Sequence, residues 1–178
     1  ATEGGFEQHQ YNAVAGTTWT SGGFLVTADF MRNDEVRASD RNYLAGLPNQ
    51  KITILPQSSQ KSALFSGHQA LGETFEVTLD AFYTERDTWD LGQTSVIFDT
   101  TRDSVIWLVA PALRANLGGD WSVRLHGAIG SNENFNGLHA YTTAGAPLAV
   151  ASPRTLFENR AEAAGVEAEG PLFALAGG

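Results

Sequence analysis

The segment Phe75-Glu-Val-Thr-Leu-Asp-Ala-Phe-Tyr-Thr84 alternates between apolar and polar side chains. Its even positions are polar except for Phe82. Its odd positions are apolar throughout: Phe75, Val77, Leu79, Ala81 and Tyr83. Successive side chains of a β-strand point to opposite faces of the sheet, so this period of two predicts a strand with one apolar and one polar face.

Two further runs of this kind follow short glycine-containing turns. The turns cover 18–24, 71–75 and 117–121, and each leads directly into an alternating run. Long polar stretches separate the hairpins at about 33–61, 86–103 and 132–156. Seven strands are therefore expected, at 8–19, 23–33, 61–71, 74–86, 104–117, 121–132 and 156–169. Short turns at one end of a sheet and long loops at the other are typical of an outer-membrane β-barrel.

Three features of the runs test this interpretation. Ala and Glu residues in 158–169 suit a helix by propensity, but Gly165 and the flanking pattern favour a strand. Pro111 cannot donate a ladder hydrogen bond, so it predicts a bulge, a locally unpaired position or a strand that begins only at Ala112. Glycines within the strands predict bulges or close approaches of the backbone; these are Gly16, Gly67 and Gly127.

Composition excludes several classes of protein. The 178 residues carry a net charge of −9, which argues against nucleic acid as a partner because its phosphates require a basic surface. The chain has no cysteine, no metal-ligating histidine spacing, no nucleophile elbow and no phosphate-binding loop. We therefore expect no enzyme activity, no metal and no cofactor. No apolar run is long enough for a transmembrane helix, whereas strands of this kind suit a transmembrane barrel.

Four segments resemble, in order, the early barrel of TonB-dependent outer-membrane receptors. The Ser-Gly-Gly turn at 21–23 with the strand after it is similar to an early hairpin of that family, and 61–86 and 112–123 resemble the next two. The closing segment 169–178 resembles the periplasmic turn Gly-Pro-Leu-Phe-x-Leu-Pro-Gly-Gly, with Ala176 in place of the proline. The chain begins without an initiator methionine and ends in a turn, so we expect a single partial barrel domain, 1–178, from a longer protein.

The resemblance implies a function and a location. The parent protein would import a scarce solute, such as a siderophore, haem, a vitamin or a glycan, across the outer membrane of a Gram-negative cell. Its partners would be outer-membrane lipid, a small-molecule ligand such as a metal chelate, and the TonB system through a plug domain that this chain lacks. The alternative is a soluble all-β ligand-binding module, either lipocalin-like or an open up-and-down sheet.

Candidate functional residues follow from the alternation. Polar side chains on the strands would face the lumen of a barrel, or bulk solvent if the sheet is one-sided and soluble: Thr27, Asp29, Glu76, Thr78, Asp80, Arg114, Asn116, Arg124 and His126. Aromatic residues near strand ends would form the membrane girdles, or pack in a soluble core: Tyr11, Trp19, Tyr83, Trp107 and Trp121.

Overall fold

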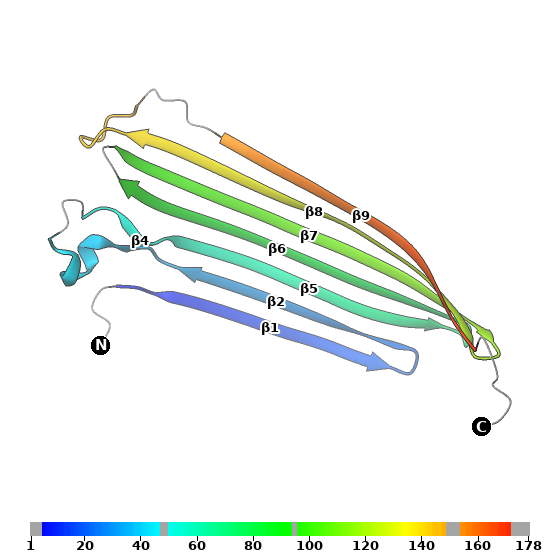
Figure 1. Cartoon of the computed structure of the whole chain (residues 1–178). Coiled ribbons are helices and arrows are strands. Elements are labelled where there is room, and N and C mark those ends of the chain that lie inside the picture. The colour runs from blue at the N-terminus through cyan, green and yellow to red at the C-terminus, as the bar shows by residue number, and fades with distance from the viewer. Residues whose placement is uncertain (1–4, 47–49, 94–95, 149–153, 172–178) are drawn as a thin grey trace, which may run out of the picture.

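The computed structural model describes residues 5–46, 50–93, 96–148 and 154–171, and they form an all-β chain. Seven strands make one antiparallel sheet in the order β1-β2-β5-β6-β7-β8-β9 (Figure 1). Their bounds are β1 Gln8–Trp19, β2 Gly22–Asn33, β5 Gln57–Leu71, β6 Phe75–Gln93, β7 Ile97–Gly118, β8 Trp121–Tyr141 and β9 Arg154–Glu169. The predicted meander of seven strands is confirmed, and so is the strand, rather than helix, at 158–169.

The connections differ at the two ends of the sheet, but the long loop predicted at 86–103 is wrong, because β6 ends at Gln93 and β7 begins at Ile97. Short turns join β1 to β2, β5 to β6 and β7 to β8 at one end, which lies on the right of Figure 1. The longer connection between β2 and β5 lies at the other end. It contains a small second sheet of β3 (Val36–Arg37) and β4 (Thr53–Leu55), with the 3-10 turns η1 (Ala38–Asp40) and η2 (Asn42–Leu44) between them. The sequence analysis missed this small sheet.

Four predicted strand lengths are wrong. β5 begins at Gln57, β6 continues to Gln93, β7 begins at Ile97 and β8 continues to Tyr141, through stretches predicted to be loops. The ladder of β6 and β7 remains in register over its whole length, from Phe75↔Ala115 to Gln93↔Ile97. Both faces of these extensions carry polar side chains, and only a few apolar ones such as Trp89 and Leu91 remain on the side of Phe75. The backbone hydrogen bonds nevertheless continue.

The register sorts the side chains onto two faces. We call the side that carries Phe75 the apolar face and the side that carries Glu76 the polar face. Directly paired residues share a face, and the pairs Val26↔Phe65, Phe65↔Ala81 and Val109↔Ile129 extend the apolar face across the sheet. The predicted separation is confirmed for the whole apolar set: Phe24, Val26, Phe30, Phe75, Val77, Leu79, Val123, Leu125 and Ile129.

Pro111 and the strand glycines have distinct local roles. The pairing of β7 with β8 runs to Val109↔Ile129 and resumes at Ala112↔His126, so the predicted unpaired position at Pro111 is confirmed on the β8 side. At Gly16 the backbone approach is close, because an added β-carbon would lie 2.7 Å from the Phe24 carbonyl oxygen.

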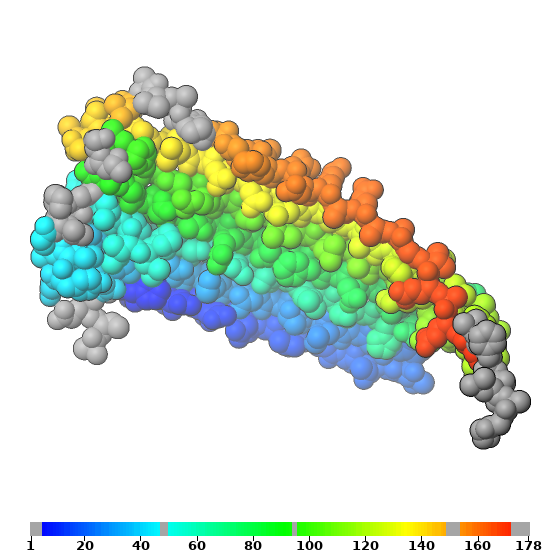
Figure 2. Space-filling model, viewed as in Figure 1, coloured from blue at the N-terminus to red at the C-terminus, as the bar shows by residue number. Residues whose placement is uncertain are grey.

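No second layer covers the sheet in the described part of the chain. Figure 2 shows β1 to β9 side by side from the blue edge to the orange edge, with no other segment over the face in view. Among the residues that the structure describes, the buried apolar side chains are only Val36, Ala38 and Ala112. None of the described helical segments is long and apolar enough to cross a membrane. The described sheet does not close into a barrel, because β1 and β9 lie at its opposite edges.

Candidate functional site

The five candidate girdle residues all lie on the apolar face. Tyr83 and Trp107 are directly paired near its middle, and Trp19 and Trp121 stand beside short turns. Trp19 also donates its indole N–H to Gln69 Oε1, at 2.9 Å. Trp19 and Trp121 lie near strand ends, as predicted, whereas Tyr83 and Trp107 lie in the middle of β6 and β7 because these strands extend beyond their predicted ends. The role of the five residues as a membrane girdle stays a prediction.

Aromatic rings are clustered on the first strands of this face. The rings of Tyr11 and Phe30 stack with their centroids 6.3 Å apart. Phe24 lies between Trp19 at 6.3 Å and Phe65 at 6.4 Å. These rings line an exposed surface, since 38% of Phe24 and 46% of Trp19 are accessible to solvent. One set of aromatic side chains, Trp19 and Trp121, lies beside the short turns, and the other, Tyr11, Tyr83 and Trp107, lies toward the long connections. We call the apolar residues of this face between these two sets the apolar band.

The short turns are staggered along the ladder. The first hairpin closes at the pair Trp19–Gly22, and the second closes one rung further on, at Leu71–Phe75. The third reaches one rung further again, near Leu117. A rung is a row of direct partners on one face, and neighbouring rungs are two residues apart along a strand. Successive short turns are two strands apart, so the turns shift by about 6.6 Å along the strands for every ~9.6 Å across them. This slope corresponds to a strand tilt of roughly 35°, which is the lower limit of the range in transmembrane barrels.

The opposite limit of the apolar band shifts in the same direction. On β1 and β2 the band ends at the paired residues Tyr11 and Phe30. On β8 and β9 it ends at Ile129 and Ala164, two and three rungs closer to the short turns. On β7, Val105 extends the apolar band one rung beyond Trp107 toward the long connections, against this shift. The band is therefore inclined to the strands by about one residue per strand.

The band has the extent of a hydrocarbon layer. On β7 it runs from Trp107 to Leu117, about 33 Å at ~3.3 Å per residue. Projected at the tilt of roughly 35°, this length is about 27 Å, close to the height of ~25 Å of the apolar band of outer-membrane barrels.

Charged side chains begin where the band ends on the side of the long connections. Lys61 Nζ lies 3.7 Å from Glu85 Oε1, and Asp87 pairs directly across the strands with Asp103. Burial raises the pKa of the Asp103 carboxyl, and the negative charges of Asp87 and Glu85 raise it further. This edge of the band is thus an acidic surface in which two carboxylates face each other.

The candidate lumen residues all lie on the polar face. Several of them form cross-strand hydrogen bonds there: Gln10 Nε2 donates to Asp29 Oδ2 at 3.1 Å, and Ser66 Oγ donates to Asp80 Oδ1 at 2.6 Å. Their shared face is established by the register, whereas their exposure to a lumen stays a prediction.

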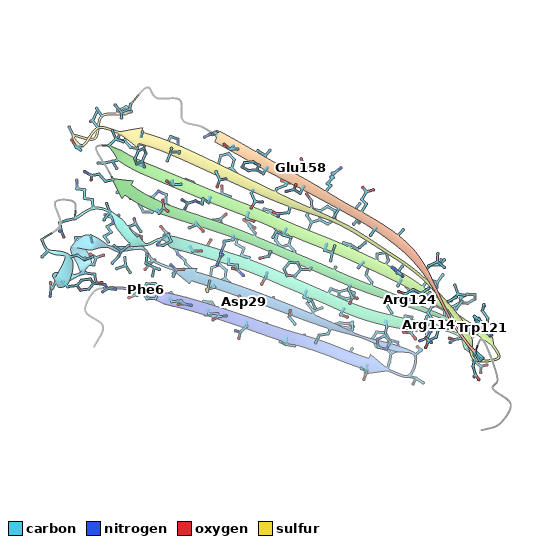
Figure 3. All side chains as sticks on the ribbon, in the orientation of Figure 1. Phe6, Asp29, Arg114, Trp121, Arg124 and Glu158 are labelled. Carbon is cyan, nitrogen blue, oxygen red and sulfur yellow. The ribbon has the colours of Figure 1, made fainter. Side chains whose placement is uncertain are left out.

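One rung of the polar face carries four charges in a row. Glu76, Arg114, Arg124 and Glu167 are successive partners across β6 to β9. Arg124 lies 3.6 Å from Glu167, and an Arg114 N–H donates to Ser122 Oγ at 3.2 Å. Figure 3 shows the two arginines near the end that carries the short turns. The two positive and two negative charges make this rung neutral.

His126 lies one rung away and packs over a glycine. Its partner is Gly165, where an added β-carbon would lie 2.5 Å from His126 Nε2. His126 Nδ1 is 4.0 Å from Glu167 Oε1. The in-strand glycine that weakened the sequence case for a helix therefore makes room for a ring.

The polar face also has an apolar centre. Leu64, Phe82 and Leu108 are direct partners across β5, β6 and β7, and each is partly exposed. Phe82, the exception in the alternation of β6, is thus one member of a short apolar row.

A second group on the polar face was missed from the sequence. Arg86, Arg102, Asn134 and Phe157 line a hollow near the long connections. Three of them lie at or beyond the ends of the predicted alternating runs, in stretches treated as loops or strand ends. Their common face could be found only once the strands were known to extend.

No family model, curated protein or solved structure matches the chain.

Within residues 5–46, 50–93, 96–148 and 154–171, no group of three or more His, Asp or Glu side chains could hold a metal ion. The predicted periplasmic turn at 169–178 lies largely outside the described residues.

Proposed function

We propose that the chain is the early part of the β-barrel of a TonB-dependent receptor in the outer membrane, which imports a scarce solute. The inclined apolar band is the observation that carries this proposal. It is uncovered, has aromatic residues at several of its limits and is inclined with the staggered turns, and these properties are typical of strands that cross a bilayer at an angle. The ordered resemblance of the hairpins to that family supports the choice among membrane barrels.

The two faces then have different tasks. Side chains of the apolar face contact lipid, with Tyr83, Trp107 and Trp121 at the two interfaces, where amphipathic rings are favoured. The polar face lines a water-filled interior, where Asp29, Asp80 and the charged rung through Arg114 hydrogen-bond to water, to solute and to the plug domain that the resemblance implies. The long connections would form the solute entrance.

Cysteine scanning tests this proposal, because the chain has no cysteine of its own. Single cysteines at 77, 79 and 81 on the apolar face and at 78, 80 and 82 on the polar face would carry an environment-sensitive fluorophore. We expect the chain, refolded into phospholipid vesicles, to show alternation: odd positions quenched by a lipid-borne quencher and even positions by a water-soluble one.

Two results would contradict the proposal. One is equal quenching at odd and even positions in vesicles. The other is a failure of the wild-type chain to associate with vesicles, together with a folded monomer in plain buffer, which would favour the soluble β-module. The variants Leu79→Lys and Thr78→Lys, which place a lysine on the apolar and on the polar face of β6, provide an independent measurement through their stability in vesicles.

A further inference from the structure

An open hollow of about 550 Å³ lies on the polar face between β6, β7, β8 and β9. It is near the long connections, beyond the level of the apolar band. Its size is within the usual range of small-molecule sites. The side chains that matter for its chemistry are Arg86, Arg102, Ser104, Asn134, Asn136 and Phe157.

The two arginines of the hollow differ in their surroundings. Arg102 Nη1 lies 2.8 Å from Asp90 Oδ2, so its charge is matched by a carboxylate. Arg86 is exposed, and its direct partners across the strands are Gln60 and Ser104. Its polar-face neighbours along β6 are threonines, and no carboxylate of the described residues forms an ion pair with it. Asp103 also lines the hollow, but its position in the ladder directs its side chain to the apolar face. A guanidinium is always charged, so the hollow presents a cation that an anionic group can satisfy.

Neutral hydrogen-bonding groups surround that charge. Asn134 is the direct partner of Ser104, and Asn136 is the direct partner of Arg102. Asn136 offers two N–H donors and a carbonyl acceptor, whereas Asn134 donates one N–H to Asn132 Oδ1 at 2.8 Å and keeps one N–H and its carbonyl oxygen. The Ser104 hydroxyl both donates and accepts. Such mixed donors and acceptors match neighbouring hydroxyl groups, which also donate and accept.

Phe157 adds an apolar platform among these polar groups. It pairs directly with Asn134, and 55% of the residue is exposed. An exposed ring in a polar hollow gains by covering an apolar surface, and the C–H face of a pyranose ring is such a surface on an otherwise hydroxylated molecule.

We propose that this hollow binds an acidic, hydroxyl-rich solute, namely an oligosaccharide containing uronic acid residues. The carboxylate pairs with Arg86, the hydroxyl groups bond to Ser104, Asn134 and Asn136, and one sugar ring lies over Phe157. This proposal rests on the proposed role in solute uptake, because it places the site inside the barrel on the solute path.

Calorimetric titration of the chain in detergent micelles tests the site with three probes. Trigalacturonate carries carboxylates and hydroxyls, maltotriose carries hydroxyls alone, and tricarballylate carries carboxylates alone. We expect trigalacturonate to bind at least about tenfold more tightly than either of the others, from the strength of charge-assisted hydrogen bonds. Raising the salt concentration should weaken its binding.

Variants assign the binding to named side chains. Arg86→Gln should weaken trigalacturonate binding by about tenfold or more, and Phe157→Leu should weaken trigalacturonate and maltotriose alike. Arg32→Gln, which removes an exposed arginine from the apolar face, is the matched control and should leave binding unchanged. All three positions are exposed, so the folded state should survive each substitution.

Four results would overturn the site: no binding of trigalacturonate, equal binding of maltotriose, equal binding of tricarballylate, or unchanged binding by Arg86→Gln. Failure here is distinguishable from failure of the proposed function. A chain that shows alternating quenching in vesicles but does not bind trigalacturonate retains the membrane role and loses this site. A chain that binds trigalacturonate but does not enter vesicles retains the site and loses the membrane role.

Discussion

At the scale of single residues, the charge pair Asp87–Asp103 is a local weakness of the sheet. Like charges directly opposite each other on neighbouring strands are unfavourable, by an amount comparable to other cross-strand pairs, about 0.2–1 kcal/mol. The raised pKa of Asp103 has the same origin together with burial. The folded chain therefore binds a proton at Asp103 more tightly than the unfolded chain does.

Asp103→Asn should raise the free energy of unfolding at pH 7. Because the folded pKa is raised, the penalty is absent below the ordinary carboxyl pKa of about 3.9 and develops as the pH rises through the folded value. The gain from Asp103→Asn should therefore disappear on acidification. Urea unfolding in detergent micelles between pH 3 and pH 8 measures it, with Glu73→Gln in an exposed turn as control. A gain that grows at low pH would contradict the assignment.

Gly130 should tolerate no side chain. An added β-carbon there would lie 2.7 Å from the Trp107 carbonyl oxygen, which belongs to the backbone of the neighbouring strand and cannot move without disturbing the ladder. Gly130→Ala should cost about 1–3 kcal/mol of stability, as overpacking usually does. Gly92→Ala is the control, because no atom lies within 4 Å of its added β-carbon. Equal unfolding midpoints for the two variants would contradict this geometry.

At the scale of elements, each strand has a segment in the apolar band and, on the longer strands, an extension beyond it. Inside the band the two faces differ, and the period of two is visible in the sequence. In the extensions both faces carry charged side chains, as at Arg102 and Asp103 on β7, and the backbone ladder is supplemented by side-chain contacts such as the ion pair of Arg102 with Asp90.

A charge placed in the band should cost far more than the same charge on the other face. Leu79→Lys puts an ammonium group near the centre of the apolar band of β6, where the expected cost is about 2–4 kcal/mol in a bilayer. Thr78→Lys places it one residue away, on the polar face, at a small cost. Unfolding by urea from phospholipid vesicles compares the two, and equal losses would be incompatible with a lipid-facing band.

The sequence predicted the strands well where burial differs between faces and poorly elsewhere. The period of two located the hairpins and the two faces, and the missing N–H of proline indicated the unpaired position at Pro111. It could not reveal the extensions, because side chains such as Asp99 and Asn134 carry no facial signal when both sides are polar. The small β3–β4 sheet was missed for a related reason: two- and three-residue strands are too short for any periodicity.

The candidate site was predicted only in part for the same reason. Arg124 and His126 were placed correctly on the polar face because they alternate with Val123 and Leu125, and Arg114 because it lies between Leu113 and Ala115. Arg86 and Phe157 were not recognised as a group, since they come together only through a register that spans four strands.

At the scale of the whole molecule, the described sheet has one layer and two unpaired edges, β1 and β9. Both edges offer free backbone groups, and the apolar band offers uncovered side chains such as Leu125 and Val166. Exposed edges and large apolar patches both promote association.

We therefore expect the chain to self-associate in plain buffer and to become monodisperse in detergent micelles. Analytical ultracentrifugation in both media, with a thermal melt alongside, measures this. A monodisperse monomer with a cooperative transition in plain buffer would contradict the membrane proposal and favour the soluble module.

The offset of successive turns displaces each strand by about one residue, along the strand direction, relative to its neighbour. With this displacement continued by any strand beside β9, β1 and β9 cannot be brought edge to edge on the same rungs. A ring built in this way closes only when the accumulated displacement is a whole number of ladder repeats. The circumference, and with it the width of any passage inside, is then set jointly by the number of strands and by a displacement of about one residue at every strand.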